Sequence, residues 1–353
     1  MQNAECRNKN FRSAAGGNIA IFIPHKGCPC RCVFCDQRAI TGQVSQPTPQ
    51  DVTEIVSKAV AVSRADRTSA PTMPQIAFFG GSFTAIDREY MHSLLEAAHG
   101  FVASGSVRGI RVSTRPDCID QDVLSLLKQY GVTAIELGAQ SMDGAVLAAS
   151  GRGHTAEDTV MAAGMIRERG FELGLQMMTG LPGADERSDM ATARALAELK
   201  PDTVRIYPAL VLKGAPLFDM YQKGDYTPQT LDDAINLCSR LLLRFNYCKI
   251  KVIKLGLHAS RDVERELVAG PYHPAFRELC ESKIYFDAAA SALTEKPPGD
   301  YTLSIPAGAV SKMTGQRREN LCWLAQMGYN CKVREDVSLP TFHVGAHCVR
   351  PQP

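Results

Sequence analysis

The amino-acid sequence predicts an α/β fold, with a partial (β/α)6 barrel of the TIM type over residues 1–284 and a small C-terminal α+β module over residues 285–353. Three observations support this prediction. Short apolar segments rich in β-branched residues alternate with amphipathic segments, which is typical of parallel strands joined by crossover helices. Polar or glycine-rich residues directly follow six of the strands, as they do where barrel strands direct side chains to one rim. The 353 residues, 45% of them hydrophobic, are enough for one large barrel and an appendage.

The elements of the barrel are expected in strict alternation. Helices are predicted where an Asp, Ser or Thr opens most of the amphipathic segments, because such side chains cap the first free backbone amides. Two of them end at Gly131 and Gly170, where a helix end needs a left-handed residue. The lysine-rich segment 249–257 is expected to close the barrel or to flank it. The seven strands begin near Ile19, Ile76, Ile110, Ala134, Glu172, Thr203 and Lys249, and the helices span 51–63, 87–98, 120–130, 155–169, 188–199 and 230–245.

The pattern changes after Ile284. The run Lys-Pro-Pro-Gly-Asp at 296–300 is typical of a turn or linker. A strand is expected at 301–305, a helix interrupted by glycine at 311–328, and one or two strands at 331–344. Modules of this kind include KH-type RNA binders, although the run Gly-Gln-Arg-Arg at 315–318 lacks the second glycine of their backbone-clamping loop. The module is therefore a candidate for RNA binding.

The formal net charge of the chain is only +2, so its overall charge favours neither nucleic acid nor a membrane surface as a partner. Two segments are locally basic, and each is more often a solvated face than a nucleic-acid contact. The basic residues are Arg244, Lys249, Lys251, Lys254 and Arg261 in the first segment, and Lys312, Arg317, Arg318, Lys332 and Arg334 in the second.

Nothing in the sequence indicates a membrane partner. No window approaches the apolar length needed to cross a bilayer, and the first residues lack a basic region followed by an apolar segment. A cytoplasmic location is expected. The twelve cysteines are then expected to be thiols and metal ligands, because the cytosol is reducing.

Three cysteines stand close together in the loop after the first strand, at residues 24–37. Cys28, Cys32 and Cys35 have C-x3-C-x2-C spacing. A structural zinc site and a regular electron-transfer cluster each take four protein ligands, so a cluster held by three thiolates leaves one iron open. An open iron can chelate a small molecule.

A zinc site is the alternative interpretation of this loop. His25 or Cys30 could supply the fourth ligand, but a zinc knuckle normally brings a second pair of ligands and no second Cys-x-x-Cys is present. Cys30 could also replace Cys28 as a ligand. We expect it instead to be a bystander thiol.

With the aromatic Phe34 just before the last cysteine, this spacing resembles the radical SAM superfamily. The resemblance implies a [4Fe-4S] cluster whose open iron binds the amine and carboxylate of S-adenosylmethionine (SAM). It also implies one-electron cleavage of SAM to a 5'-deoxyadenosyl radical, with an electron donor such as flavodoxin or ferredoxin.

Six further motifs, between about Ile19 and about Tyr226, resemble the radical SAM half of the Elongator catalytic subunit, which is similar in turn to oxygen-independent coproporphyrinogen oxidase. Elongator subunits continue into an acetyltransferase domain, and the tail after Ile284 is too short for one. Their carboxymethylation of wobble uridine is therefore not carried over. The motifs are Gly80–Thr84, Ser113–Asp117, Glu136–Ser141, Arg152–Thr155, Met177–Gly183 and Arg205–Val211.

The resemblance also implies where SAM binds. The two glycines after the second strand would let backbone approach the methionyl end, and the serine that follows would take its ammonium. Arg152 is the strongest expected contact, because a guanidinium matches a carboxylate in bidentate geometry. Ser113 stands where both related families commonly carry a glutamate, and Gln176 replaces an acidic residue of the coproporphyrinogen enzymes. The expected cofactor-binding residues are Phe34, Gly80, Gly81, Ser82, Ser113, Gln140, Arg152 and Gln176, and no catalytic residue is identified.

Three functions are compatible with these observations. The leading hypothesis is a radical SAM enzyme that abstracts hydrogen from RNA or tRNA. The first alternative is a coproporphyrinogen oxidase-like enzyme acting on a tetrapyrrole or another small molecule, and the second is a non-catalytic, metal-stabilised RNA-binding protein. The proline-rich segment 270–276, with one tyrosine and one histidine, could be a substrate lid or a loop that closes the barrel.

Overall fold

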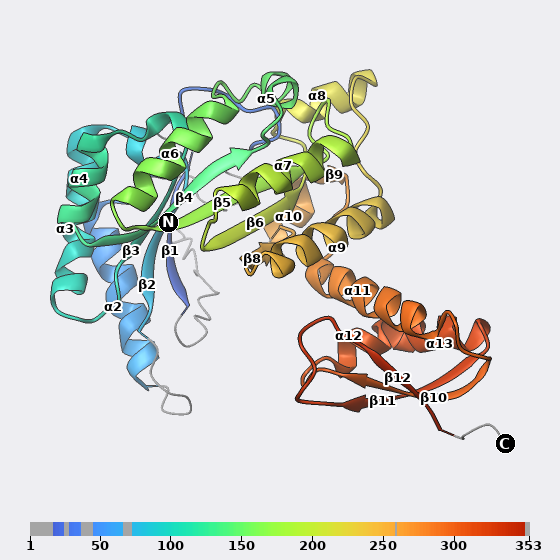
Figure 1. Cartoon of the computed structure of the whole chain (residues 1–353). Coiled ribbons are helices and arrows are strands. Elements are labelled where there is room, and N and C mark those ends of the chain that lie inside the picture. The colour runs from blue at the N-terminus through green and yellow to red at the C-terminus, as the bar shows by residue number, and fades with distance from the viewer. Residues whose placement is uncertain (1–16, 25–27, 37–44, 66–72, 258–259, 350–353) are drawn as a thin grey trace, which may run out of the picture. The chain divides into compact units, whose positions relative to one another are not determined.

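The computed structural model describes residues 17–24, 28–36, 45–65, 73–257 and 260–349 (Figure 1). The chain forms two compact units. One unit comprises residues 1–139 and 151–175, and the other comprises residues 140–150 and 176–353. His25 and Gln37, at the margins of the cysteine loop, lie outside the described residues.

The main sheet confirms the predicted α/β fold of a partial TIM-like barrel. Its seven strands are parallel and follow one another in chain order. The last strand pairs only with its predecessor among the described residues, so it flanks the sheet and does not close it. The strands are β1 (Asn18–Ile23), β2 (Gln75–Gly80), β3 (Ile110–Thr114), β4 (Val132–Gln140), β5 (Glu172–Thr179), β6 (Thr203–Pro208) and β8 (Lys251–Leu255).

The six predicted crossover helices are present, with ends shifted by a few residues. Their caps explain the boundaries: Asp87 and Asp120 each accept a backbone N–H at a helix start, and Thr155 and Asp185 form capping boxes. The expected left-handed glycines follow two helix ends, with φ of +76° at Gly131 and +72° at Gly170. The helices are α2 (Pro49–Ala65), α3 (Arg88–Ala103), α4 (Gln121–Gln129), α6 (Ala156–Glu168), α7 (Glu186–Glu198) and α9 (Leu231–Tyr247).

Several elements were not predicted from the sequence. The longest is α11 (Phe276–Leu293), which buries the polar residues Glu281 and Ser282 beside apolar ones, so its sequence has no clean amphipathic pattern. The others are too short to show a period. They are η1 (Phe83–Ala85), η2 (Pro116–Cys118), α5 (Gly144–Ala149), β7 (Val211–Leu212), α8 (Pro216–Lys223), α10 (Arg261–Glu266) and β9 (Leu267–Ala269).

The C-terminal α+β module is confirmed as a three-stranded sheet with helices packed on it (Figure 1). The central strand β10 (Gly299–Ile305) pairs in parallel with β11 (Tyr329–Glu335) and antiparallel with β12 (Gly345–Cys348). The expected strand region at 331–344 was only partly right, because β12 begins after Val344. The helical segments between β10 and β11 are α12 (Val310–Thr314), η3 (Gln316–Arg318) and α13 (Glu319–Gln326).

The core of the module extends into α11. Tyr285, Ala289 and Leu293 pack with the buried residues of β10, α12, α13 and β11. Earlier in the same helix, the backbone carbonyl of Cys280 accepts a hydrogen bond from Ser239 of α9. The expected boundary between residues 284 and 285 falls inside this helix and stays a prediction. No helix among the described residues is both long and apolar enough to span a bilayer.

Candidate active site

The cysteine loop after β1 brings two predicted ligands close to two predicted SAM contacts. Cys28 Sγ lies 3.8 Å from Ser82 Oγ, and Cys32 Sγ accepts a hydrogen bond of 3.3 Å from Arg152 Nη1. The backbone N–H of Cys35 donates to the carbonyl of Cys32, which folds the last ligand back on the second. All five residues belong to the same compact unit.

The environment of the thiols suits an anionic metal cluster. Burial, then the nearby Cys32 and Cys28 thiols, raise the pKa of Cys35 to about 12, and the guanidinium of Arg152 opposes this rise. A thiolate at Cys35 is therefore unfavourable without a compensating cation, and metal coordination supplies one. No three His, Cys, Asp or Glu side chains converge on one ion position in the described part of the chain. A cluster does not require such convergence, because its three cysteines bind different irons.

Arg152 is buried, with 7% of its surface exposed. Its Nη2 donates to the carbonyl of Gly138 on β4 at 2.5 Å, and this bond holds the guanidinium against Cys32. The remaining Nε is buried and has no hydrogen-bond partner among the described residues. One donor of the guanidinium is thus still available for a ligand.

Two further buried cationic or imidazole groups surround the same loop. Arg115 is 2% exposed and forms a bidentate ion pair with Asp117, while its Nη1 lacks a partner among the residues described. His154 interacts through Nε2 with the carbonyl of Ala139, and burial, then Arg152 and Arg115, lower its pKa to about 4. The imidazole is therefore neutral at physiological pH. Sequence reasoning did not select either residue, although both stand inside motifs that it quoted.

Cys30 contacts the residue that follows Arg152. A Cβ placed on Gly153 would come within 2.5 Å of Cys30 Sγ, so the thiol is packed against the glycine backbone. Gly153 also has a φ of +75°, which favours glycine. The position of Cys30 is explained by this packing. Phe34, the predicted aromatic contact, is partly exposed.

The glycine pair after β2 forms a close backbone approach. Gly80 has a φ of +111°, and a Cβ there would lie 2.8 Å from the carbonyl oxygen of Ile23, at the end of β1. The N–H of Gly81 donates to the same carbonyl at 2.7 Å. Only glycine fits at position 80, and the buried residues Gly81 and Ser82 follow it directly.

Ser113 belongs to a buried polar network on one face of β3. Its Oγ donates to Glu136 Oε2 at 3.3 Å, and Glu136 Oε1 accepts from Arg111 at 3.1 Å. Arg111 also pairs with Glu172 at 2.6 Å and donates to Gln75. Glu136 on β4 therefore places a carboxylate beside Ser113, the β3 residue that stands in the position of the glutamate in the related families.

The two predicted glutamines lie together in the other compact unit. Gln176 Nε2 donates to Gln140 Oε1 at 3.3 Å. Gln140 is 4% exposed and has a φ of +64°, a left-handed conformation that is uncommon outside glycine. Such strain is typical of functional positions, where the surrounding structure enforces it.

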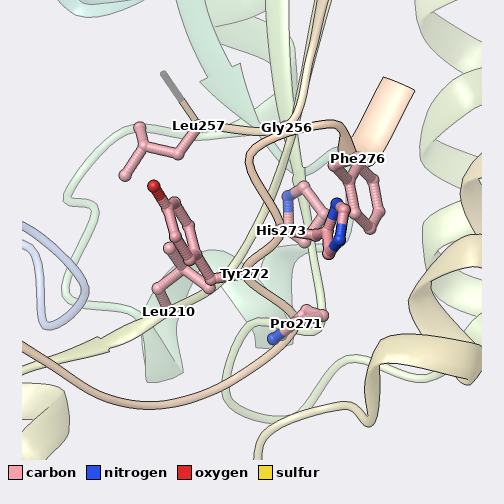
Figure 2. Close-up of a pocket in the computed structure, with 8 residues that line it drawn as sticks. Leu210, Gly256, Leu257, Pro271, Tyr272, His273 and Phe276 are labelled. Carbon is pink, nitrogen blue, oxygen red and sulfur yellow. The ribbon is translucent and has the colours of Figure 1, made fainter. Parts of the chain in front are cut away.

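A shallow hollow lies at the ends of β6 and β8, under the segment 271–276 (Figure 2). Tyr272, His273 and Phe276 line it, together with Pro208 and Gly256. It has no enclosed space for a water molecule. The backbone N–H of Ala275 donates to His273 Nδ1, and Tyr272 donates to Glu264. The segment thus lies at two strand ends, a position that suits both a substrate lid and a loop that closes the barrel.

Two family models match the chain. Residues 22–196 match the family model described as the radical SAM superfamily, and residues 201–285 match the one described as the radical SAM C-terminal domain. The two matches together take in more than half of the chain.

Several curated relatives are named tRNA uridine(34) acetyltransferase or Elongator complex protein 3. The chain is 28% identical over 272 residues to a protein of Methanocaldococcus jannaschii named tRNA uridine(34) acetyltransferase, covering 66% of this chain and 50% of the relative. It is 27% identical over 226 residues to Elongator complex protein 3 of Bos taurus, covering 58% and 40%. The chain thus spans about half the length of the curated relatives it matches, or less.

A solved structure shares the fold. The archaeal Elp3 of Methanocaldococcus infernus, with an N-terminal deletion, superposes with a TM-score of 0.59 at 22% identity. The alignment covers 77% of this chain and 63% of that one.

Proposed function

This chain belongs to the radical SAM superfamily and is an enzyme, and we propose that it binds one [4Fe-4S] cluster through Cys28, Cys32 and Cys35. The single observation that carries the proposal is the contact between Arg152 and Cys32, because a buried guanidinium on a thiol fits a site of concentrated negative charge. Cys30 is packed against Gly153 and is left out of the ligand set. The cluster, when bound, supplies the electron that cleaves SAM into methionine and a 5'-deoxyadenosyl radical.

The residues that hold SAM in this proposal are those selected from the sequence. The backbone at Gly80 and Gly81 admits the methionyl end, and Ser82 Oγ accepts from its ammonium. The free Nε of Arg152 donates to its carboxylate. Gln140 and Gln176 present amide groups to the ribose hydroxyls, and Phe34 contributes an apolar surface. Ser113 acts with Glu136, whose carboxylate replaces the missing glutamate.

The substrate in this proposal is RNA, and tRNA in particular. Support comes from the names of the curated relatives and from the basic surface of the C-terminal module. Arg317 and Arg318 are exposed at the turn between α12 and α13, and Lys332 and Arg334 are exposed on one side of β11. Lys312 is excluded from this surface, because it pairs with Glu281 at 2.7 Å. The module from residue 285 onward would then bind RNA and the residues before it would carry the barrel chemistry.

Arg317 and Arg318 are held in an unusual conformation. Both have left-handed backbone angles, with φ of +50° and +64°. The buried Asn320 donates to the carbonyls of Lys312 and Met313 and to Ser282, which pins the turn. Holding two arginines in a fixed turn reduces the entropy lost on binding a phosphate backbone.

The test of the proposal is anaerobic reconstitution with iron and sulfide, followed by dithionite and SAM. We expect 5'-deoxyadenosine from the wild-type protein and none from Cys32→Ala. Addition of total tRNA is expected to increase its yield or to give hydrogen transfer into RNA. A reconstituted cluster that leaves SAM intact would contradict the enzyme proposal, and stimulation by a tetrapyrrole in place of tRNA would contradict the substrate. A cytoplasmic location and an electron donor such as flavodoxin or ferredoxin complete the proposal.

A further inference from the structure

A pair of cations lies on one face of the last two strands of the main sheet. Arg205 of β6 and Lys254 of β8 are direct partners in the strand register, so their side chains project from the same face. Their neighbours Ile206 and Leu255 project from the opposite face and are buried, and α9 packs on β8. Tyr207 lies two residues after Arg205 and accepts a hydrogen bond from its Nη1 at 3.4 Å.

Lys254 has no counter-ion within the described structure. It is half-buried, and neither a carboxylate nor a hydrogen-bond acceptor contacts its ammonium among the described residues. Burial, then Arg205 and Arg277, lower the pKa of Lys254. Like charges at directly opposite strand positions destabilise a sheet. The repulsion between the two side chains therefore carries a folding cost.

The carboxylate of Glu281 on α11 is already paired with two other cations. Glu281 pairs with Arg277 at 2.9 Å and with Lys312 at 2.7 Å. Arg277 also donates to the carbonyl of Val252. Two cations thus share one carboxylate in the first half of α11, and Lys254 has no carboxylate partner among the described residues.

We propose that Lys254, with Arg205 and Tyr207 beside it, binds an oxyanion of the substrate, either a phosphate or a carboxylate. A half-buried ammonium, a guanidinium and a phenol supply donors on one surface, as oxyanion recognition requires. None of these residues is among those selected for the cluster or SAM. The inference rests on the proposed function, because the oxyanion would be part of the substrate of that enzyme.

The hollow in Figure 2 lies at the ends of the same two strands. Gly256, which lines the hollow, follows Lys254 by two residues, and Pro208 follows Tyr207. The backbone N–H of Ala275 donates to His273 Nδ1, which orients the ring. The two strands that carry the cations thus lead to a set of apolar and aromatic residues at their ends.

The experiment measures anion binding by the reconstituted protein with isothermal titration calorimetry. The probes are pyrophosphate, citrate and total tRNA, and the variants are Lys254→Gln, Lys254→Arg and the control Lys251→Gln. Lys251 lies on the same strand but is exposed. We expect Lys254→Gln to weaken binding of at least one probe by about tenfold or more, as loss of a charge-assisted contact does. Lys254→Arg should retain binding within a few-fold, and Lys251→Gln should change it by less than about twofold.

The probes separate the sources of the oxyanion. If Lys254→Gln weakens the binding of pyrophosphate and tRNA but not of citrate, the oxyanion is a phosphate. If it weakens the binding of citrate alone, the oxyanion is a carboxylate. Equal binding by wild type and Lys254→Gln, or no binding of any probe by wild type, would overturn the inference. SAM cleavage without substrate is a separate readout that Lys254→Gln should leave unchanged. If the wild-type protein does not cleave SAM, the proposed function is contradicted, but the affinities for the anions still test the inference about Lys254.

Discussion

Arg152 and Cys32, which are 120 residues apart in the chain, are joined by a hydrogen bond of 3.3 Å from Nη1 to Sγ. The bond is oriented by the second hydrogen bond of the guanidinium, from Nη2 to Gly138. A fixed positive charge on a cluster thiolate stabilises the reduced cluster, because reduction adds negative charge. In the proposed site, one guanidinium would therefore contact both a cluster ligand and the SAM carboxylate.

Replacing Arg152 with glutamine is expected to lower the midpoint potential of the reconstituted cluster. The reason is the loss of a buried positive charge and of a hydrogen bond to sulfur, both of which favour the reduced state. The measurement is a redox titration followed by electron paramagnetic resonance. The midpoint potential of Arg152→Lys should lie between those of the wild type and Arg152→Gln. Arg169 is an exposed arginine that donates to Gln121, and Arg169→Gln should have the potential of the wild type. A midpoint potential that is unchanged in Arg152→Gln would show that the contact is structural.

Alanine at Cys28, Cys32 or Cys35 is expected to abolish the cluster, since each thiolate is proposed to hold one iron. Iron and acid-labile sulfide are measured after anaerobic reconstitution. Cys30→Ala is the matched control from the same loop and should keep near wild-type content, because its thiol packs on Gly153. Loss of the cluster in that variant would contradict the ligand assignment.

Gly80→Ala is expected to destabilise the fold. The Cβ would lie 2.8 Å from the carbonyl oxygen of Ile23, and the φ of +111° is unfavourable for any side chain, a strain of about 1–3 kcal/mol. Thermal or urea unfolding of the apoprotein gives the free energy of unfolding. Gly100→Ala is the control, because this glycine of α3 has open space around it and alanine there should stabilise by about 0.5–1 kcal/mol. Equal stability of the two variants would contradict the close approach.

Asp189 predicts a pH dependence of stability. It is 2% exposed, its Oδ2 accepts the N–H of Gly180 at 3.0 Å, and burial raises its pKa from 3.8 to about 7. The folded state therefore binds more protons than the unfolded state between about pH 4 and pH 7. Its contribution to stability is complete below pH 4 and is lost as the pH rises through 7.

Asp189→Asn keeps an acceptor for Gly180 and removes the titration. We expect the difference in free energy of unfolding, wild type minus variant, to fall as the pH rises from about 4 to about 7. Urea unfolding at several pH values measures it. A difference that is constant with pH would show that the carboxyl titrates at its ordinary value.

Charge reversal at Arg317 and Arg318 is expected to weaken RNA binding and to reduce its dependence on salt, since each phosphate contact contributes about one unit to the salt slope. SAM cleavage without substrate should not change. Lys223→Glu, on exposed surface of α8, is the control. Affinity is measured with total tRNA at several salt concentrations. Binding by wild type that is absent or independent of salt would favour a small-molecule substrate.

Sequence alone determined the order of strands and helices in the barrel and the place of the cysteine loop. These features depend on residues a few positions apart: the alternation of apolar residues, the caps at Thr155 and Asp185, and the left-handed glycines after α4 and α6. The glycine pair after β2 was identified in the same way. Local physics is sufficient for such predictions, because each signal lies within a single element or turn.

Only the tertiary structure decided which distant side chains meet. The contact of Arg152 with Cys32, the carboxylate of Glu136 beside Ser113 and the register that sets Arg205 opposite Lys254 all depend on strand pairing between separate elements. The helix α11 was missed for the related reason that its buried residues contact two different groups of elements. Burial and partner choice are properties of the packed chain, and no local period in the sequence encodes them.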